Sequence, residues 1–306
     1  MTKPFLCVYG HTNLDYIMSL ERFPELNTSV NVREKRSYFG GTGANVATIA
    51  ASLGVPTALC SYVGNDFPED FRALMREKGV DLRDLVEVEG QETPTVWVIS
   101  DGDHNQIAYV YQGPMARMES MPLLLCAAKE AEWVHIITGR PPYYLKVMEE
   151  LKRTGKRIAF DPAQEIHNVW NKGWFSKAIE MAEAFFCNES ELRTALRYLD
   201  MSTPEEILEK VGLLVNTRGA HGSVVYTREE KITVPAIKPA RIVDTTGAGD
   251  AFRAGFFAGL HRELPLKECA LAGSAAASYV IEANGSLTNI PTWKKVQARM
   301  ERAQRN

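Results

Sequence analysis

Residues 244–260 have the sequence DTTGAGDAFRAGFFAGL, in which two glycines precede a run of small and apolar residues. Gly247 and Gly249 precede small and apolar residues at helical spacing, which predicts a glycine-rich turn that leads into a buried helix. Glycines at such a turn let backbone N–H groups approach an anion, and the helix dipole adds attraction for phosphate. The stretch therefore predicts a phosphate-binding helix N-terminus.

Asp250 falls in the first turn of this predicted helix, facing the expected anion. A carboxylate there would repel phosphate unless it has another use. Accepting the proton of an attacking hydroxyl group is the simplest such use, and it indicates phosphoryl transfer from a nucleoside triphosphate. The alternative is a helix that is merely capped, since Asp is also common at helix starts.

A second glycine-rich stretch, GGTGANVATIAASLG, occupies residues 40–54. Its small residues would let a flat ligand pack close to the backbone, and Asn45 supplies a donor and an acceptor for hydroxyl groups. No Gly-Lys-Ser/Thr follows the glycines, so the stretch is not a P-loop. Asp15 follows the first predicted strand, at the sheet edge where open α/β sheets bind ligands. Asp15 and Asn45 together suit a polyol; the alternatives are close helix–strand packing and a turn-forming Asp.

Short apolar runs alternate with amphipathic helical patterns over most of the chain. Buried strands are expected at 4–10, 57–64, 133–139, 156–162, 182–188 and 213–219. Helices are expected at 43–53, 67–79, 143–155, 188–199 and 204–212. This alternation predicts an α/β fold with a parallel sheet that is covered on both faces.

Two segments, 29–40 and 92–113, instead alternate polar with apolar residues, which is typical of half-exposed antiparallel strands. A hairpin turn is expected at 101–105. We therefore expect one domain spanning residues 1–306, with a small inserted β layer built from segments about 12–40 and 92–113. The aromatic residues of the second segment are either a patch that covers a ligand or packing against the main body. These residues are Trp97, Tyr109 and Tyr111.

Two short motifs between the glycine-rich stretches suit a nucleotide. CNESEL (187–192) opens a helix, where Glu191 could hold a magnesium-bound water; a capping box of Asn188 and Glu191 is the alternative. TRGAHG (217–222) forms a turn from which Thr217 could reach a phosphate, and a plain hairpin turn is the alternative. Asp161, at the end of a predicted strand, also falls on the ligand edge of the sheet.

The composition excludes several classes of protein. With 35 Lys and Arg against 38 Asp and Glu, the net charge is −3, so no basic surplus indicates a nucleic-acid partner. No apolar stretch is long enough to span a bilayer, and the first residues do not form a signal peptide. Five scattered cysteines without a CxxC are typical of buried thiols in a reducing compartment. We expect a cytoplasmic protein with no membrane partner, and a core position for His135.

The ordered motifs resemble those of the ribokinase-like (PfkB) family of carbohydrate and nucleoside kinases along nearly the whole chain. GGTGANVA and DTTGAGDAFRAGF match the two hallmark stretches of the family, with CNESEL and TRGAHG between them. GHTNLDYI, ETPTVWVISDGDHNQ and GSLTNIPTW look most like the archaeal-type nucleoside kinases of that family. The resemblance implies a central, mainly parallel sheet flanked by helices. It also implies a small β-sheet lid that closes over the acceptor and pairs with a second lid in a homodimer.

The resemblance further implies a role for each matching residue. Asp250 matches the catalytic base, and the anion hole is matched by Gly247, Ala248 and Gly249. The family positions that bind the hydroxyl groups of the acceptor are matched by Asp15, Gly41 and Asn45. The nucleotide and Mg²⁺ side is matched by Asn188, Glu191, Thr217, Gly219 and Gly222. A monovalent-cation site is matched by Asp244, Thr246, Ala283, Gly285 and Asn289. Asn289 replaces the frequent Ser of the family, which leaves K⁺ dependence open.

DPAQ at 161–164 departs from the D-x-N-x-R form of typical sugar kinases, and it would let Gln164 contact a base. We therefore predict an ATP- and Mg²⁺-dependent kinase of the 5′-hydroxyl of nucleosides such as inosine, guanosine, cytidine and adenosine. Two alternatives stay open. One is a sugar or sugar-phosphate kinase of the ribokinase or phosphofructokinase type, and the other is a non-catalytic nucleoside or sugar sensor.

Overall fold

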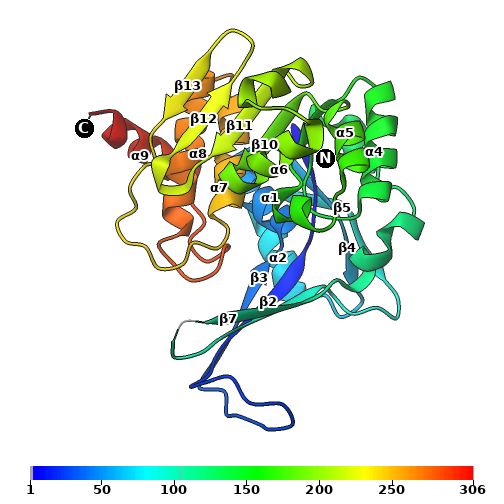
Figure 1. Ribbon diagram of the computed structural model, residues 1–306, viewed down its shortest axis with the longest axis vertical. Coiled ribbons are helices and arrows are strands. Elements are labelled where there is room, and N and C mark those ends of the chain that lie inside the picture. Colours follow the sequence, from blue (N-terminus) through cyan, green and yellow to red (C-terminus); the bar gives the residue numbers. More distant parts are fainter. Residues whose placement is uncertain (1–2, 104, 306) are drawn as a thin grey trace.

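The main body is built on one nine-stranded sheet, in a computed structural model that describes residues 3–103 and 105–305 (Figure 1). The strand order is β13-β12-β11-β10-β9-β8-β1-β4-β5. The strands are β1 (Leu6–Tyr9), β4 (Thr57–Gly64), β5 (Val80–Val88), β8 (Trp133–Ile136), β9 (Arg157–Phe160), β10 (Ala184–Asn188), β11 (Leu213–Thr217), β12 (Ser223–Tyr226) and β13 (Lys231–Val234). The pairs β11–β12 and β12–β13 are antiparallel, and the other pairs are parallel. The predicted, mainly parallel sheet is confirmed.

Helices cover both faces of this sheet, because successive strand side chains point to opposite sides. One face packs against α1 (Thr42–Ser52), α2 (Glu69–Lys78), α7 (Ala248–Leu260), α8 (Leu266–Val280) and α9 (Trp293–Arg305). The other packs against α3 (Cys126–Glu130), α4 (Pro141–Arg153), α5 (Lys172–Ile179) and α6 (Glu189–Leu199). Along β1, Leu6 and Val8 belong to the first core and Cys7 and Tyr9 to the second.

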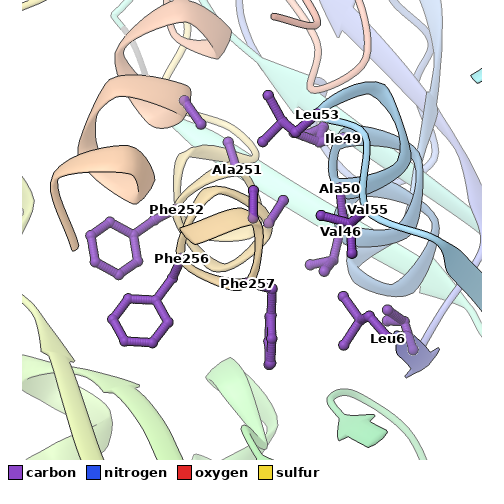
Figure 2. Packing of buried hydrophobic residues seen from close by; sticks show 14 of the residues in the cluster. Leu6, Val46, Ile49, Ala50, Leu53, Val55, Ala251, Phe252, Phe256 and Phe257 are labelled. Carbon is purple, nitrogen blue, oxygen red and sulfur yellow. The ribbon is translucent and has the colours of Figure 1, made fainter. Parts of the chain in front are cut away.

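Helices α1 and α7 pack directly against each other, and this contact places the two glycine-rich stretches side by side (Figure 2). Val46, Ile49 and Ala50 of α1 lie opposite Ala251 of α7. Because both helices begin at the carboxyl edge of the sheet, their N-termini face the same space. The small residues that favoured a ligand site therefore also serve the close packing of helices.

A separate four-stranded sheet, which we call the lid sheet, extends below the main body in Figure 1. Its order is β3 (Glu34–Gly40), β2 (Asn13–Ser19), β6 (Thr95–Ser100) and β7 (Gln106–Tyr111). The two predicted antiparallel segments are confirmed, because segment 92–113 contains the antiparallel pair β6–β7 and β3 of segment 29–40 runs antiparallel to β2. No strand was predicted at β2 itself, and β2 pairs with β6 in parallel. The central strands β2 and β6 leave the main body in the same direction. They are joined where they start by a hydrogen bond from the Leu14 N–H to the Pro94 carbonyl. Of the predicted hairpin turn, His104 lies outside the described residues.

Two smaller expectations are corrected. The segment predicted as a helix at 204–212 is a short 3₁₀ helix, Pro204–Glu209, which the capping box of Thr203 and Glu206 opens and which ends before Gly212. Cys126 is exposed, whereas the other four cysteines are buried as expected. Over the described residues, no helix combines the length and apolar character that crossing a membrane requires.

Candidate active site

A cavity of about 740 Å³ opens at the carboxyl edge of the main sheet, beside the base of the lid sheet. Most of the residues that the motifs singled out line it together. They are Asp15, Gly41, Asn45, Gln164, Asn188, Glu191, Thr217, Gly219, Thr246, Gly247, Ala248, Gly249 and Asp250. Gly222, Asp244, Ala283, Gly285 and Asn289 are not part of this lining.

Asp250 lies in the first turn of α7, behind a glycine turn in which Gly247 has a left-handed φ of 76°. Its Oδ2 accepts a hydrogen bond of 2.8 Å from Asn45 Nδ2, which joins the two glycine-rich stretches. Asn45 Oδ1 is buried and has no hydrogen-bond partner among the described residues. Burial raises the pKa of Asp250 to about 6, while Arg253 and Asn45 oppose that rise. Asp250 is therefore a carboxylate that exchanges its proton close to neutral pH.

Asp15 enters the cavity from β2 of the lid sheet, where Asn13 Nδ2 donates to its Oδ1 at 2.5 Å. Burial raises the pKa of Asp15 to about 7, and the Asn13 hydrogen bond limits the rise. A Cβ at Gly40 would collide with this carboxylate, and one at Gly41 would collide with the His11 backbone. Gly40 and Gly41 therefore leave space for the Asp15 side chain and the His11 backbone, which is close packing within the protein. Gly41 also lines the cavity.

The helix start at CNESEL is a capping box. Asn188 Oδ1 accepts from the Glu191 N–H, and Glu191 Oε2 accepts from the Asn188 N–H at 2.7 Å. Burial raises the pKa of Glu191, whose side chain still lines the cavity. The capping box that was the alternative to a magnesium contact is therefore present, and Glu191 can still contact a ligand in the cavity.

Gly222 closes the turn between β11 and β12 away from the cavity. Its φ is 84°, and a Cβ there would collide with the Val234 carbonyl. Gly222 is needed for the close approach of the β13 end, so the turn alternative accounts for it. Thr217 and Gly219 of the same motif do face the cavity.

Of the residues predicted near a monovalent cation, Asp244, Thr246 and Gly285 form a hydrogen-bonded loop next to the glycine turn at Gly247. Asp244 Oδ1 accepts from the Thr246 N–H, and Oδ2 accepts from the Gly285 N–H, both at 2.9 Å. Although partial burial opposes it, these hydrogen bonds lower the pKa of Asp244. Asn289 uses its amide differently, since Nδ2 donates to the Tyr279 carbonyl at 2.6 Å. Ala283 lies in the turn that follows α8.

Arg253 lines the cavity although sequence reasoning did not select it. Its guanidinium forms a bidentate ion pair with Asp161 at the end of β9, and both residues are buried. The sequence could have indicated Arg253, because it is an arginine within an otherwise apolar helical segment. His135 is fully buried as expected, and its Nε2 lies 3.7 Å from Asp161 Oδ2.

A second group of polar residues in the cavity lining was also missed. His11 Nδ1 lies 2.7 Å from Thr138 Oγ1, and His11 Nε2 lies 2.5 Å from Gln112 Oε1. Glu165 Oε2 accepts from the Gly139 N–H at 2.6 Å, and burial raises the pKa of Glu165 to about 7. Each of these residues follows a strand or a lid segment, so position at a strand end was the usable signal.

One of the three lid aromatics fits the interpretation of a patch that covers a ligand, and the other two do not support packing against the main body. Tyr111 lines the cavity. Trp97 stacks on Tyr16 of the neighbouring strand, with ring centroids 6.4 Å apart. Tyr109 is 55% exposed. Only the end of the hairpin therefore contributes an aromatic wall to the cavity.

Comparison with known proteins agrees with this arrangement. Residues 3–293 match the family described as pfkB family carbohydrate kinase. A nucleoside kinase of Methanocaldococcus jannaschii is 38% identical over 97% of this chain and 96% of its own length. The crystal structure of a nucleoside kinase from that organism has a TM-score of 0.91 with 36% identity, covering 99% of this chain and 100% of the other. The structure of a Burkholderia thailandensis nucleoside kinase in complex with inosine has a TM-score of 0.87 with 25% identity, covering 98% of both chains.

The match spans both hallmark motifs, and the fold is that of the solved relatives, so the family and the fold class predicted from the motifs are confirmed. A family of kinases also confirms the predicted enzyme class, a phosphotransferase that acts on a hydroxyl group. This chain belongs to the pfkB family of carbohydrate kinases.

Proposed function

We propose that this protein is a nucleoside kinase that transfers the γ-phosphoryl group of ATP to the 5′-hydroxyl of a nucleoside. The observation that carries the proposal is the buried Asp250 carboxylate at the N-terminus of α7, hydrogen-bonded to Asn45 within the cavity. Relatives that cover nearly the whole chain are nucleoside kinases, and one of them binds inosine. The cavity volume falls within the range of small-molecule sites.

In the proposed reaction, Asp250 accepts the proton of the 5′-hydroxyl while its oxygen attacks the γ-phosphorus. A new P–O bond forms, and the bond to the bridging oxygen of ADP breaks. The backbone N–H groups of residues 247–249 stabilise the charge on the phosphoryl oxygens. Asp15 and Asn45 bind ribose hydroxyls, and Gln164 faces the base.

A coupled assay of ADP release tests this function. The panel contains inosine, guanosine, cytidine and adenosine, together with ribose and fructose 6-phosphate. We expect turnover with the nucleosides. Turnover confined to ribose or fructose 6-phosphate would instead identify a sugar or sugar-phosphate kinase. No turnover with any acceptor, combined with thermal stabilisation by a nucleoside, would identify a sensor.

The proposal includes Mg²⁺ bound with ATP, and K⁺ beside the anion hole. No group of three or more His, Cys, Asp or Glu suited to a metal lies within residues 3–103 and 105–305. Phosphate oxygens and water would therefore supply most Mg²⁺ ligands, with Glu191 holding a bound water. When bound, Mg²⁺ neutralises charge on the phosphates. The Asp244–Gly285 loop supports a cation contact, and assays with EDTA, or with tetramethylammonium in place of K⁺, test both ions.

The proposed base predicts the pH dependence. Asp250 works only when ionised, and burial raises its pKa to about 6. We therefore expect kcat/KM for the nucleoside to reach its plateau above about pH 7, where Asp15 is also ionised, and to fall as the pH decreases through about 7 and then about 6. A pH–rate profile between about pH 5 and pH 9 measures this limb. A plateau that persists down to pH 5 would contradict the assignment of this pKa to the base.

We also propose a homodimer formed through the lid sheet. Strand β7 is an edge strand, and its apolar residues Ile107, Tyr109 and Val110 are 41%, 55% and 57% exposed. An exposed apolar edge strand is a ready surface for pairing with another chain. Tyr109→Lys should convert the dimer to a monomer in sedimentation velocity. Ile242→Lys changes an apolar residue outside the lid sheet that is 69% exposed, against 55% for Tyr109, and should leave the dimer intact. A wild-type monomer would refute this assembly.

A further inference from the structure

The buried side chain of Arg253 has one guanidinium nitrogen that its bidentate ion pair with Asp161 does not use. Nε and Nη2 both donate to Asp161, with Nη2 2.9 Å from Oδ1. Nη1 donates no hydrogen bond to any residue in the described part of the chain, although it lies 4.0 Å from Asp250 Oδ1. Arg253 is only 8% exposed and lines the cavity, so the unused nitrogen belongs to the floor of the site.

The position of Nη1 is beside the first turn of α7. A Cβ at Gly249 would lie 2.5 Å from Nη1, so the missing side chain of Gly249 makes room for the guanidinium. Gly249 itself belongs to the glycine turn that faces the expected phosphate. Nη1 therefore lies next to the anion hole, on the same side as Asp250.

Asp161 fixes the guanidinium in this place. It is fully buried at the end of β9, and its Oδ1 also accepts from the Ala163 N–H at 3.1 Å. Because a bidentate pair leaves the planar guanidinium little rotational freedom, the direction of Nη1 is set before a ligand arrives. The arrangement is costly as a purely structural element, since both charges are taken out of water.

Among the described side chains that line the cavity, acidic groups outnumber Arg and Lys. Asp250, Glu191 and Asp15 all line the cavity. Among the described residues of the lining, Arg253 is the one arginine. A transferring phosphoryl group would meet repulsion from these acids. A fixed guanidinium offsets that repulsion most strongly at the stage when charge spreads over the phosphoryl oxygens.

We propose that Arg253 is a catalytic residue whose Nη1 donates to an oxygen of the transferring phosphoryl group, and that Asp161 is the positioning residue that aims it. This inference rests on the proposed kinase function. The balance of bonds in the reaction is unchanged, because Arg253 transfers no proton and only stabilises the charge that develops.

The first test compares Arg253→Met and Arg253→Lys in the coupled assay. We expect Arg253→Met to lower kcat by about 10²- to 10³-fold, with KM for nucleoside and ATP within about threefold of wild type. Arg253→Lys should recover part of the loss, since it keeps the charge but not the fork that Asp161 holds. An interaction made only in the transition state predicts this division between kcat and KM.

A second readout does not depend on turnover. ADP, aluminium fluoride and inosine together mimic the charged transition state, and inosine alone mimics the ground state. Arg253→Met should lose the extra thermal stabilisation that the ternary mixture gives wild type, and should keep that given by inosine. A merely structural role would reduce both shifts equally, and that result would overturn the proposal.

Asp161→Asn/Arg253→Met guards against misfolding, because it removes both members of the buried pair and leaves no unpaired charge. If Asp161 acts only through Arg253, this variant should match Arg253→Met in kcat. Arg83→Met, which removes an ion pair with Asp81 and Glu130 outside the cavity, is the matched control and should keep wild-type kcat.

The outcomes separate this inference from the kinase function. A double variant with kcat within about threefold of wild type overturns the role of Arg253 and leaves the kinase function standing. A wild-type protein that phosphorylates no nucleoside overturns the kinase function itself.

Discussion

Asp250→Asn should lower kcat by about 10³- to 10⁴-fold while inosine still binds. The amide has nearly the same shape as the carboxylate, and it can still hydrogen-bond Asn45, whose Nδ2 lies 2.8 Å from Asp250 Oδ2. It cannot accept the proton of the 5′-hydroxyl. Coupled ADP-release kinetics measure kcat, and thermal stabilisation by inosine measures binding.

The matched control is Asp84→Asn. Asp84 is also a buried carboxylate, 4% exposed, but it accepts from the Ala127 N–H on the far side of the sheet and is absent from the cavity lining. We expect its kcat to stay at the wild-type value. Near-normal turnover of Asp250→Asn would rule out the general base. Loss of stabilisation by inosine along with kcat would point to a binding role instead.

Gly247→Ala should lower kcat by about 10²-fold and also lower the melting temperature. Gly247 has a left-handed φ of 76°, which costs an alanine roughly 1–2 kcal/mol. A Cβ there would also collide with the Ser286 side chain, so the turn has to shift. A small displacement of the N–H groups of residues 247–249 weakens their contact with the phosphoryl oxygens. Single-turnover kinetics and a thermal melt measure the two effects.

Gly79→Ala separates backbone strain from displacement of the anion hole. Gly79 has a φ of 90° at the end of α2, and a Cβ there would meet no atom within 4 Å. It should lose stability by a similar strain and keep wild-type kcat. Equal kcat losses in the two variants would show that the turn at Gly247 does not act through the anion hole.

The sequence predicted the parts of the fold that depend on local signals. The glycine turn at Gly247, the helix that follows it and the buried strands are each encoded by neighbouring residues. Strand β5, Val80–Val88, was missed because its polar residues interrupt the apolar run. The parallel pairing of β2 with β6 was missed because it depends on how two distant segments leave the main body.

The residues of the candidate site were likewise predictable where they belong to a local motif. Asp250 and Asn45 each stand in a glycine-rich motif, so the sequence could select both. Arg253 gains its meaning only from Asp161, which lies 92 positions away along the chain. Gly43 was interpreted as space for a ligand, but a Cβ there would collide with the backbone of Gly10. Its small size serves strand–helix contact, which no local pattern distinguishes from ligand contact.

The hydrogen bond between Asn45 and Asp250 also has a consequence for synthesis of the protein. The two residues are 205 positions apart, and α1 needs α7 as its packing partner. During synthesis, Asn45 therefore leaves the ribosome long before Asp250, the proposed base. A truncated chain that ends before α7 lacks the proposed base, and we expect it to show no kinase activity. Activity should appear only once nearly the whole polypeptide has emerged.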